Sequence, residues 1–232
     1  MLGGDDSNDA ALIDSMLDWW AQAGVDTAIA EAPRDWLKPQ PRVAVTTQEA
    51  AVVAEVATAP LTLEAVQALR SGPFAVAPGG SVAAGLMFLA DMPEPDDLAE
   101  GRLLGGPAGR LFDRMLAAIG RERDAVYTAS IADTRTPTGR IEAGAMAALL
   151  ATARHHVALA APRVLVLLGD TASRAILGAP VAAMRGGLHP ITIEGSAMHA
   201  IATFHPRTLL QHPLAKAEAW ADLRRITGAL AA

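Results

Sequence analysis

The sequence has no cysteine among its 232 residues, and aromatic residues make up only 4% of it. Without cysteine, the chain can form neither disulfides nor thiolate nucleophiles, and it can hold neither a thiolate zinc site nor a cysteine-bound iron–sulfur cluster. Its longest apolar runs, such as Val164–Leu168, are far shorter than the ~20 residues that a membrane-spanning helix needs. The first residues are acidic where a secretory signal would be basic. We therefore expect a soluble, cytoplasmic protein with no membrane partner.

Positive charge is also scarce, because 19 basic residues face 25 acidic ones and the formal net charge is −6. This balance argues against a strongly basic coat for nucleic acid, although a local basic cleft remains open. Neither a Walker sequence nor a G-x-G-x-x-G follows an expected strand, which disfavours a nucleotide cofactor. Hydrophobic residues reach 51%, enough for a real core.

Three segments are expected along the chain. Residues 1–36 form an N-terminal helical extension, because apolar side chains recur at helical spacing over residues 8–24. Residues 37–60 are rich in alanine, valine and proline, which is typical of a disordered linker, with a short helix over Thr47–Val56 as the alternative. Residues 61–232 form the main folded domain.

Short apolar runs and helical patterns alternate in this domain. The expected strands are Leu86–Ala90, Val126–Ile131, Val164–Leu168 and His199–Phe204. The expected helices are Leu63–Leu69, Ala108–Ile119, Ile141–Leu159, Thr171–Leu177 and Leu214–Ile226. Uninterrupted apolar strands suit a parallel sheet that is buried on both faces. The alternation predicts the α/β class, as a three-layer α/β/α sandwich around a mainly parallel, four-stranded sheet.

Ligands of open parallel sheets bind beyond the carboxyl ends of the strands, so the residues there are candidate site residues. The first strand runs into Asp91-Met92-Pro93-Glu94-Pro95-Asp96-Asp97. Its carboxylates could orient a water, act as a base or bind a hard metal. A solvated acidic turn is the favoured alternative.

Three further strand ends carry polar residues. Arg135 and Arg140 follow the second strand among hydroxyl side chains and could hold phosphate, although an ordinary polar loop is more frequent. Gly169 follows the third strand and could let a helix N-terminus approach an anion, or serve tight packing alone. His205 follows the last strand and precedes Pro206, so it could be an electrophile or acid, or merely a helix-capping or partly buried histidine.

Taken together, these stretches resemble the uracil-DNA glycosylase superfamily, and within it the bacterial iron–sulfur branch called family four, with the closest likeness to alphaproteobacterial members. The family's Gly-Glu-Ala-Pro-Gly is matched by Ala90-Asp91-Met92-Pro93-Glu94, and its Gly-x-Pro-Phe-x-Gly-x-x-Gly by Gly101 to Gly109. Its Pro-Lys/Arg-Val-x-Val-x-Leu-Gly is matched by Pro162 to Gly169, and its His-Pro-Ser/Ala-x-Leu-Leu by His205 to Leu210. The likeness covers nearly the whole chain except the linker.

The resemblance implies hydrolysis of the bond between a base and deoxyribose, on a nucleotide turned out of the DNA stack. Asp91 then takes the place of the glutamate that positions water and stabilises the positive sugar, and it is one methylene shorter. His205 takes the place of the histidine that stabilises negative charge on the departing base. These two residues are the implied catalytic pair.

The resemblance also assigns contacts to the base and to the DNA. The implied base-binding residues are Ala90, Met92, Pro93, Leu104 and Ser130. Leu104 falls at the family's aromatic stacker and Ser130 at its asparagine, so a π-face and a paired donor and acceptor are both lost. The implied DNA-binding residues are Arg135, Arg140, Arg185, Pro206 and Arg207. Arg207 stands where the family has a small residue, and it could contact phosphate or face solvent.

The cluster cysteines of the family are missing here. Two of their places fall at Thr134 and Leu149, and the two earlier ones lie within residues 68–76. The resemblance therefore implies a protein without cofactor or metal, whose core and turns must hold the loops near the DNA.

Three functions follow as hypotheses. The first is a glycosylase-type hydrolase acting on uracil or another deaminated base in DNA during base excision repair, as a monomer. The second is a catalytically degenerate protein that keeps the fold and binds DNA or a protein partner without excision. The third is a hydrolase whose pocket around Leu104 and Ser130 prefers a different base.

Overall fold

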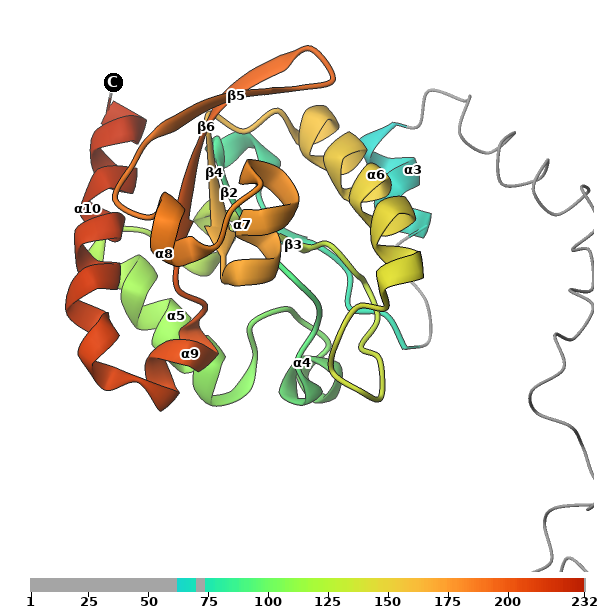
Figure 1. Cartoon of the computed structure of the whole chain (residues 1–232), viewed down its shortest axis with the longest axis horizontal. Coiled ribbons are helices and arrows are strands. Elements are labelled where there is room, and N and C mark those ends of the chain that lie inside the picture. The colour runs from blue at the N-terminus through green and yellow to red at the C-terminus, as the bar shows by residue number, and fades with distance from the viewer. Residues whose placement is uncertain (1–61, 70–73, 232) are drawn as a thin grey trace, which may run out of the picture. The chain divides into compact units, whose positions relative to one another are not determined.

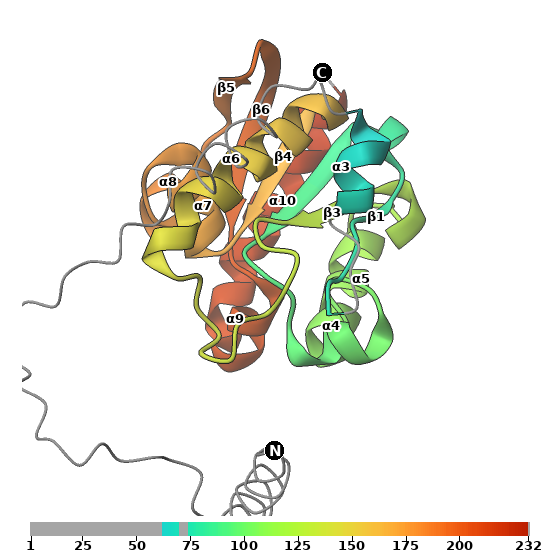
Figure 2. The ribbon, with the colours of Figure 1, turned by 90° about the vertical axis from the view of Figure 1, so that its right-hand side faces the viewer.

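The structure is a computed structural model, and it describes residues 62–69 and 74–231. The chain divides into two units, residues 1–58 and residues 59–232. The N-terminal helix predicted over residues 8–24 and the linker predicted over residues 37–60 lie outside the described residues. The second unit holds the elements shown in Figures 1 and 2.

The described residues form one six-stranded sheet with the order β1-β3-β2-β4-β6-β5. Its strands are β1 (Gly79–Gly80), β2 (Leu86–Ala90), β3 (Tyr127–Ser130), β4 (Val164–Leu168), β5 (His189–Ile193) and β6 (Ser196–Thr203). The four central strands pair in parallel, whereas β1 and β5 pair antiparallel to their neighbours. The predicted α/β class with a mainly parallel centre is confirmed. The structure adds two edge strands that the sequence pattern did not predict.

Helices cover both faces of this sheet (Figure 1). The longer ones are α3 (Leu63–Leu69), α5 (Gly106–Ala118), α6 (Ala143–Ala160), α7 (Asp170–Leu177) and α10 (Lys216–Ala231). The shorter ones are α4 (Pro95–Glu100), α8 (Val181–Met184) and α9 (Pro206–Gln211), with 3-10 turns η1 (Val82–Ala84), η2 (Arg123–Ala125) and η3 (Pro213–Ala215). The short helices α4, α8 and α9 were not predicted.

Alternate side chains of each central strand point to opposite faces and build two separate cores. Leu86 and Phe88 of β2 pack with side chains of α5, α9 and α10. Met87 and Leu89 pack with side chains of α6 and α7. Phe88 also meets Phe112 of α5 edge to face, with ring centroids 5.0 Å apart. The sheet is therefore the middle layer of three.

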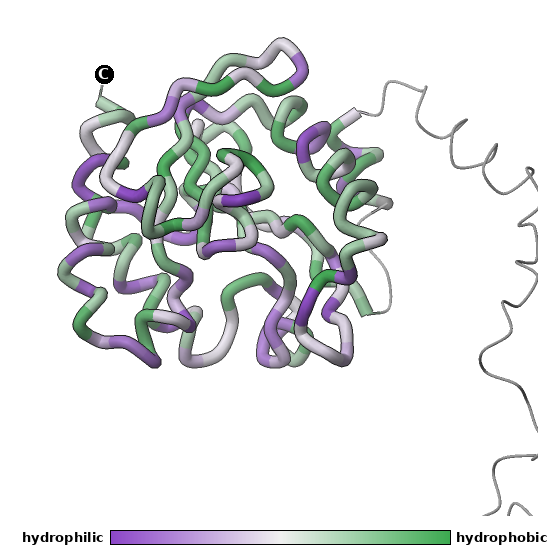
Figure 3. Tube along the Cα trace, in the orientation of Figure 1, coloured by the Kyte–Doolittle hydropathy of each residue, from purple (hydrophilic) through white to green (hydrophobic). Residues whose placement is uncertain are grey.

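Hydropathy follows this layering. Hydrophobic colour runs along the central strands in Figure 3, and several hydrophilic segments lie in loops at the lower edge of that view. Among the helices that the structure describes, not one has the length and apolar character required to cross a membrane.

The carboxyl ends of the parallel strands lie at the bottom of this view, where β2 leads into α4 and β6 leads into α9 (Figure 1). The loops after β2, β3, β4 and β6 thus lie together at the carboxyl ends of the parallel strands. The topology places the candidate site residues there.

Candidate active site

Asp91 lies at the carboxyl end of β2 and is 7% exposed. Its backbone is fixed because the pairing of β2 with β3 continues past the strand ends, where the amides of Ile131 and Ala132 donate to the carbonyls of Ala90 and Asp91 at 2.9 Å. Asp91 Oδ1 accepts from the amide of Met92 at 3.0 Å. Its other oxygen, Oδ2, accepts from Arg207 Nη2 at 2.6 Å.

His205 follows β6 and is 1% exposed. It is the N-cap of α9, and its Nδ1 accepts from the amide of Arg207 at 3.2 Å. A neutral imidazole that accepts at Nδ1 carries its proton on Nε2. Helix capping, the alternative to a chemical role, is thus observed, and it fixes the tautomer in which Nε2 is a donor.

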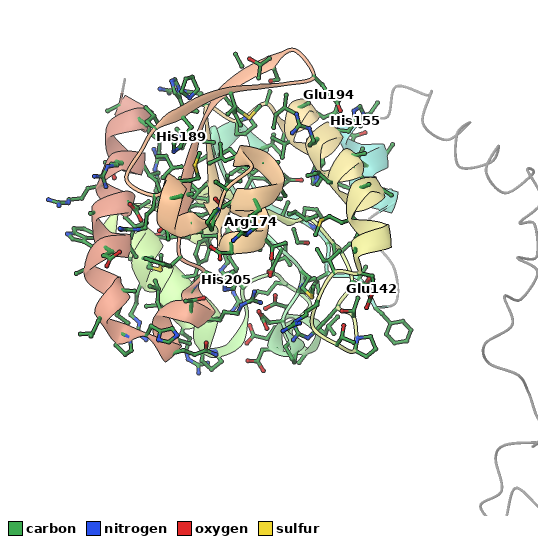
Figure 4. All side chains as sticks on the ribbon, in the orientation of Figure 1. Glu142, His155, Arg174, His189, Glu194 and His205 are labelled. Carbon is green, nitrogen blue, oxygen red and sulfur yellow. The ribbon has the colours of Figure 1, made fainter. Side chains whose placement is uncertain are left out.

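Electrostatics keep this histidine neutral. Burial lowers the pKa of His205 to about 4, the charge of Arg207 acts in the same direction, and the charge of Asp91 opposes both. At neutral pH the imidazole is therefore uncharged. Figure 4 shows His205 at the lower edge of the sheet, whereas His155, Glu194 and His189 lie toward the opposite edge.

Gly169 separates these two strand ends. It follows β4, which lies between β2 and β6 in the sheet. A Cβ built on Gly169 would lie 3.4 Å from the Cβ of His205. Asp170 Oδ1 accepts from the amide of Val181 at 2.8 Å, which ties α7 to α8. These contacts agree with the packing alternative for Gly169.

The acidic loop after β2 is a hydrogen-bonded structure. Asp97 is 2% exposed, and its carboxylate accepts from the amide of Glu94 at 2.9 Å and from that of Gly105 at 2.6 Å. Burial raises the pKa of Asp97, and the hydrogen bonds from these amides partly offset it. The favoured interpretation as a solvated acidic turn is wrong for Asp91 and Asp97, because both are buried. Within residues 62–69 and 74–231, no group of three or more histidine or acidic residues could hold a metal.

Four side chains link the loops after β2, β3 and β6 by ion pairs, and we call them the ion-pair chain: Asp91, Arg207, Glu94 and Arg135. Arg207 pairs with Asp91 and, through Nη1, with Glu94 Oε1. Arg135 Nη1 lies 3.2 Å from Glu94 Oε2 and donates to the carbonyl of Pro93 at 3.0 Å. The sequence did not reveal the role of Glu94, because its partners lie 41 and 113 residues away along the chain.

The implied base-binding residues are buried near these strand ends. Ala90, Met92, Leu104 and Ser130 are each at most 3% exposed, and Ala90 pairs with Ser130 across β2 and β3. Leu104 has a left-handed backbone with φ of 56° and packs into the same core as Phe88 and Phe112. A residue other than glycine in this region stores strain, of a kind that functional sites often hold.

Arg123 holds Leu104 in that conformation. It donates to the carbonyls of Leu103 and Leu104 at 2.8 and 2.9 Å, and it pairs with Asp113 at 2.7 Å. Its guanidinium also lies over the ring of Phe112, 5.2 Å from the centroid. Sequence reasoning missed this residue, since no local motif marks one arginine among many.

The other implied DNA-binding residues have different surroundings. Arg140 is exposed in a turn where Thr136 Oγ1 accepts from the Arg140 amide at 3.1 Å. Arg185 pairs with Glu218 at 2.7 Å and with the buried Asp222 at 3.2 Å. Pro206 is buried in the first turn of α9. The DNA contacts of these residues stay predictions.

Comparison with known proteins decides the family. The family model described as the uracil DNA glycosylase superfamily matches residues 78–224, which include strands β1 to β6 and the ion-pair chain. The chain belongs to this superfamily. The resemblance to the superfamily is thereby confirmed, and the likeness to alphaproteobacterial members stays a prediction.

Two curated relatives of this superfamily member carry the name type-4 uracil-DNA glycosylase. The protein of Archaeoglobus fulgidus is 27% identical over 157 residues, which cover 63% of this chain and 77% of the relative. The protein of Sulfurisphaera tokodaii is 25% identical over 136 residues, which cover 55% of this chain and 62% of the relative. The chain thus spans less than two thirds of the second relative's length.

The iron–sulfur cluster expected for this branch does not fit the residues present. Thr134, at one cysteine place, forms an isolated β-bridge with Ala75, and the amide of Val76 donates to the carbonyl of Asp133 at 2.9 Å. Leu149, at another, packs against the core that faces α6. Neither side chain is a ligand for iron. Backbone hydrogen bonds and apolar packing occupy these places instead.

Proposed function

We propose that the protein hydrolyses the N-glycosidic bond of uracil or another deaminated base in DNA, as part of base excision repair. One observation carries the proposal. A buried carboxylate, Asp91, and a neutral histidine, His205, stand at the carboxyl ends of two parallel strands that flank β4. Membership of the superfamily and the names of the two relatives support it.

The chemistry follows from charge. As the bond between the base and C1′ breaks, the base gains negative charge and the sugar gains positive charge. The Nε2 N–H of a neutral imidazole can donate a hydrogen bond to the base, and the lowered pKa of His205 keeps the imidazole uncharged at neutral pH. Asp91 stabilises the positive sugar and orients the water whose oxygen bonds to C1′. The water's proton passes to the departing base through Asp91 or solvent.

The shape of the base pocket determines which base is accepted. Ser130 offers one hydroxyl where paired recognition of a pyrimidine edge needs a donor and an acceptor together. Leu104 contributes apolar contact without an aromatic face. Both features predict weaker discrimination between uracil and other bases than paired readout gives. Oligonucleotides with uracil, hypoxanthine or xanthine test this directly, and a strict preference for uracil would contradict it.

A single-uracil oligonucleotide tests the reaction itself. Asp91→Asn and His205→Asn should each lower the excision rate by about 100-fold or more, because each removes one stabilising interaction of the transition state. Two matched controls lie toward the amino-terminal ends of the parallel strands, away from Asp91 and His205. Asp124→Asn in η2 and His199→Asn in β6, opposite the first residue of β4, both replace exposed side chains, and both should leave the rate unchanged. Equal rates in all four variants would overturn the proposal.

A second function, binding without excision, is favoured by one observation. Arg207 places a positive charge on Asp91, where the reaction would need an open carboxylate. A degenerate glycosylase would bind DNA in a salt-dependent way and release no base at any enzyme concentration. Product from the wild-type protein that Asp91→Asn abolishes would reject this alternative.

A further inference from the structure

Arg207 and Glu94 contact one another across two segments that are far apart in the sequence. Glu94 caps α4 after β2, whereas Arg207 lies in the first turn of α9 after β6. In the family-four pattern that the sequence resembles, these two positions hold a glycine and a small residue. The two residues form an ion pair with each other, and Arg207 also pairs with Asp91, so we treat them as one unit.

The ion-pair chain holds Asp91 in a form that is poor for hydrolysis. The guanidinium binds Asp91 Oδ2 at 2.6 Å, while Oδ1 accepts from the Met92 amide. A positive charge this close opposes the positive charge that develops on the sugar. The Arg207 charge therefore has to move before Asp91 can stabilise the transition state.

The guanidinium is able to move. The Arg207 side chain is 37% exposed, in contrast to the 9% of Asp91. A phosphodiester offers the same two-pronged partner for a guanidinium as a carboxylate does. Exchange of one paired anion for another leaves the arginine satisfied, and the released Asp91 carboxylate keeps the hydrogen bond from the Met92 amide.

We propose that Arg207 is a phosphate-responsive positioning residue: it holds Asp91 and Glu94 in the free protein, and a backbone phosphate of bound DNA takes its guanidinium and releases Asp91. This inference rests on the proposed excision reaction. It also assigns a role to Glu94, which keeps the released guanidinium near Asp91. The ligand is a DNA phosphate, and free inorganic phosphate is the competing source of the same chemistry.

The first test measures binding and needs no catalysis. For an undamaged single-stranded oligonucleotide, Arg207→Gln should lower the slope of log affinity against log salt by about 1, the loss of one phosphate contact. Arg163→Gln is the matched control, because Arg163 donates to the carbonyl of Leu230 at the opposite edge of the sheet. An unchanged slope in Arg207→Gln would show that Arg207 reaches no phosphate, and would overturn the proposal.

The second test follows the pKa of His205 by NMR. Arg207 lowers that pKa, so the pKa should rise in Arg207→Gln, and it should rise in the wild-type protein when the oligonucleotide binds. Inorganic phosphate alone at the same phosphate concentration should cause a smaller rise, since it lacks the rest of the strand. Equal rises in wild type and Arg207→Gln on DNA binding would contradict the proposal. Equal effects of inorganic phosphate would assign the response to any phosphate rather than to DNA.

The third test uses excision from an oligonucleotide in which one phosphate beside uracil is replaced by a neutral methylphosphonate. Wild type should lose kcat about tenfold at one of the two positions, whereas Arg207→Gln should show a raised KM, a retained kcat and no sensitivity. Arg207→Lys, which keeps the charge, should restore the sensitivity. If Arg207→Gln and Arg207→Lys both had a kcat as low as that of Asp91→Asn, the proposal would be overturned. If neither the wild type nor any variant excised a base, the proposed function would be rejected instead. The first two tests would still show whether Arg207 contacts a DNA phosphate.

Discussion

His205 combines two roles in one side chain. Its Nδ1 caps α9, so the cap leaves the proton on Nε2, the atom that donates to the base in the proposed reaction. Burial and Arg207 together lower its pKa to about 4. A residue with this pKa stays neutral across the whole physiological range, and its protonation cannot limit excision near neutral pH.

This pKa predicts a pH dependence of stability. Between pH 6.5 and pH 4, the unfolded chain binds a proton at this histidine that the folded protein does not. The free energy of unfolding should therefore fall as the pH falls through this window, by about 3 kcal/mol at most, and the contribution should be constant below pH 4.

Denaturant unfolding at several pH values measures this effect in the difference between wild type and His205→Asn. Asparagine is also a good N-cap, so the helix start is preserved. The two proteins should diverge as the pH is lowered from 6.5. Parallel stability curves would show that His205 titrates at its ordinary pKa in the folded state.

At the scale of elements, α5 depends on a close approach of two backbones. Gly109 lies so near the left-handed Leu104 that a Cβ would come within 1.9 Å of the Leu104 carbonyl oxygen. Gly144 in α6 is a contrasting helical glycine, because a Cβ there would meet nothing within 4 Å.

Gly109→Ala should lower the free energy of unfolding by about 3 kcal/mol, since the backbone of the Leu104 turn must shift and strain Arg123's hydrogen bonds. Gly144→Ala should raise it by roughly 0.5–1 kcal/mol through helix propensity. Thermal unfolding of both variants gives the comparison. A neutral Gly109→Ala would mean that the Leu104 turn is not held as the structure shows.

Sequence patterns predicted the central elements well and the edges poorly. Leu86–Ala90 and Val164–Leu168 are continuous apolar runs because both faces of β2 and β4 are buried, and their predicted bounds match the structure. β1 has two glycines, and β5 alternates between partly buried and exposed residues, so neither has the apolar run that marks a central strand. Helices α4 and α9 have six residues each, too few to show a period.

For the candidate site, too, local sequence features were predictable and contacts between distant residues were not. Positions at strand ends placed Asp91 and His205 at one edge, because parallel topology brings the carboxyl ends together. Sequence alone could not show that Arg207 pairs with Asp91, because the pairing joins residues 116 positions apart. Arg135 and Arg207 were expected at DNA, and their ion pairs to Glu94 became visible only in three dimensions.

For the whole molecule, charge is divided unevenly along the chain. Residues 1–58 contain ten acidic and three basic side chains, whereas residues 59–232 contain fifteen acidic and sixteen basic ones. The net charge of −6 therefore comes from the first unit, and the unit that contains the superfamily match is close to neutral. The acidic total says little about how the second unit meets DNA.

A chain shortened to residues 59–232 should bind an oligonucleotide several-fold more tightly than the full chain at about 10 mM salt, where charges act over roughly 30 Å. The difference should disappear near 1 M salt, where that range shrinks to about 3 Å. A full-length variant with Asp5, Asp6, Asp9, Asp14 and Asp18 changed to asparagine is the control for length. Weaker binding by the shortened chain, with its circular dichroism unchanged, would contradict the charge argument.

The sheet's two outer strands have a consequence for association between copies. Exposed strand edges are templates for pairing with another chain, and proteins blunt them by shortness or proline. Among the described residues, the β1 edge has only two residues, and β5 carries Pro190, which has no amide hydrogen to donate. Both lateral margins of the sheet are thus protected against edge-to-edge aggregation. Sheet extension is therefore disfavoured at these two strands, which do not carry Asp91 or His205.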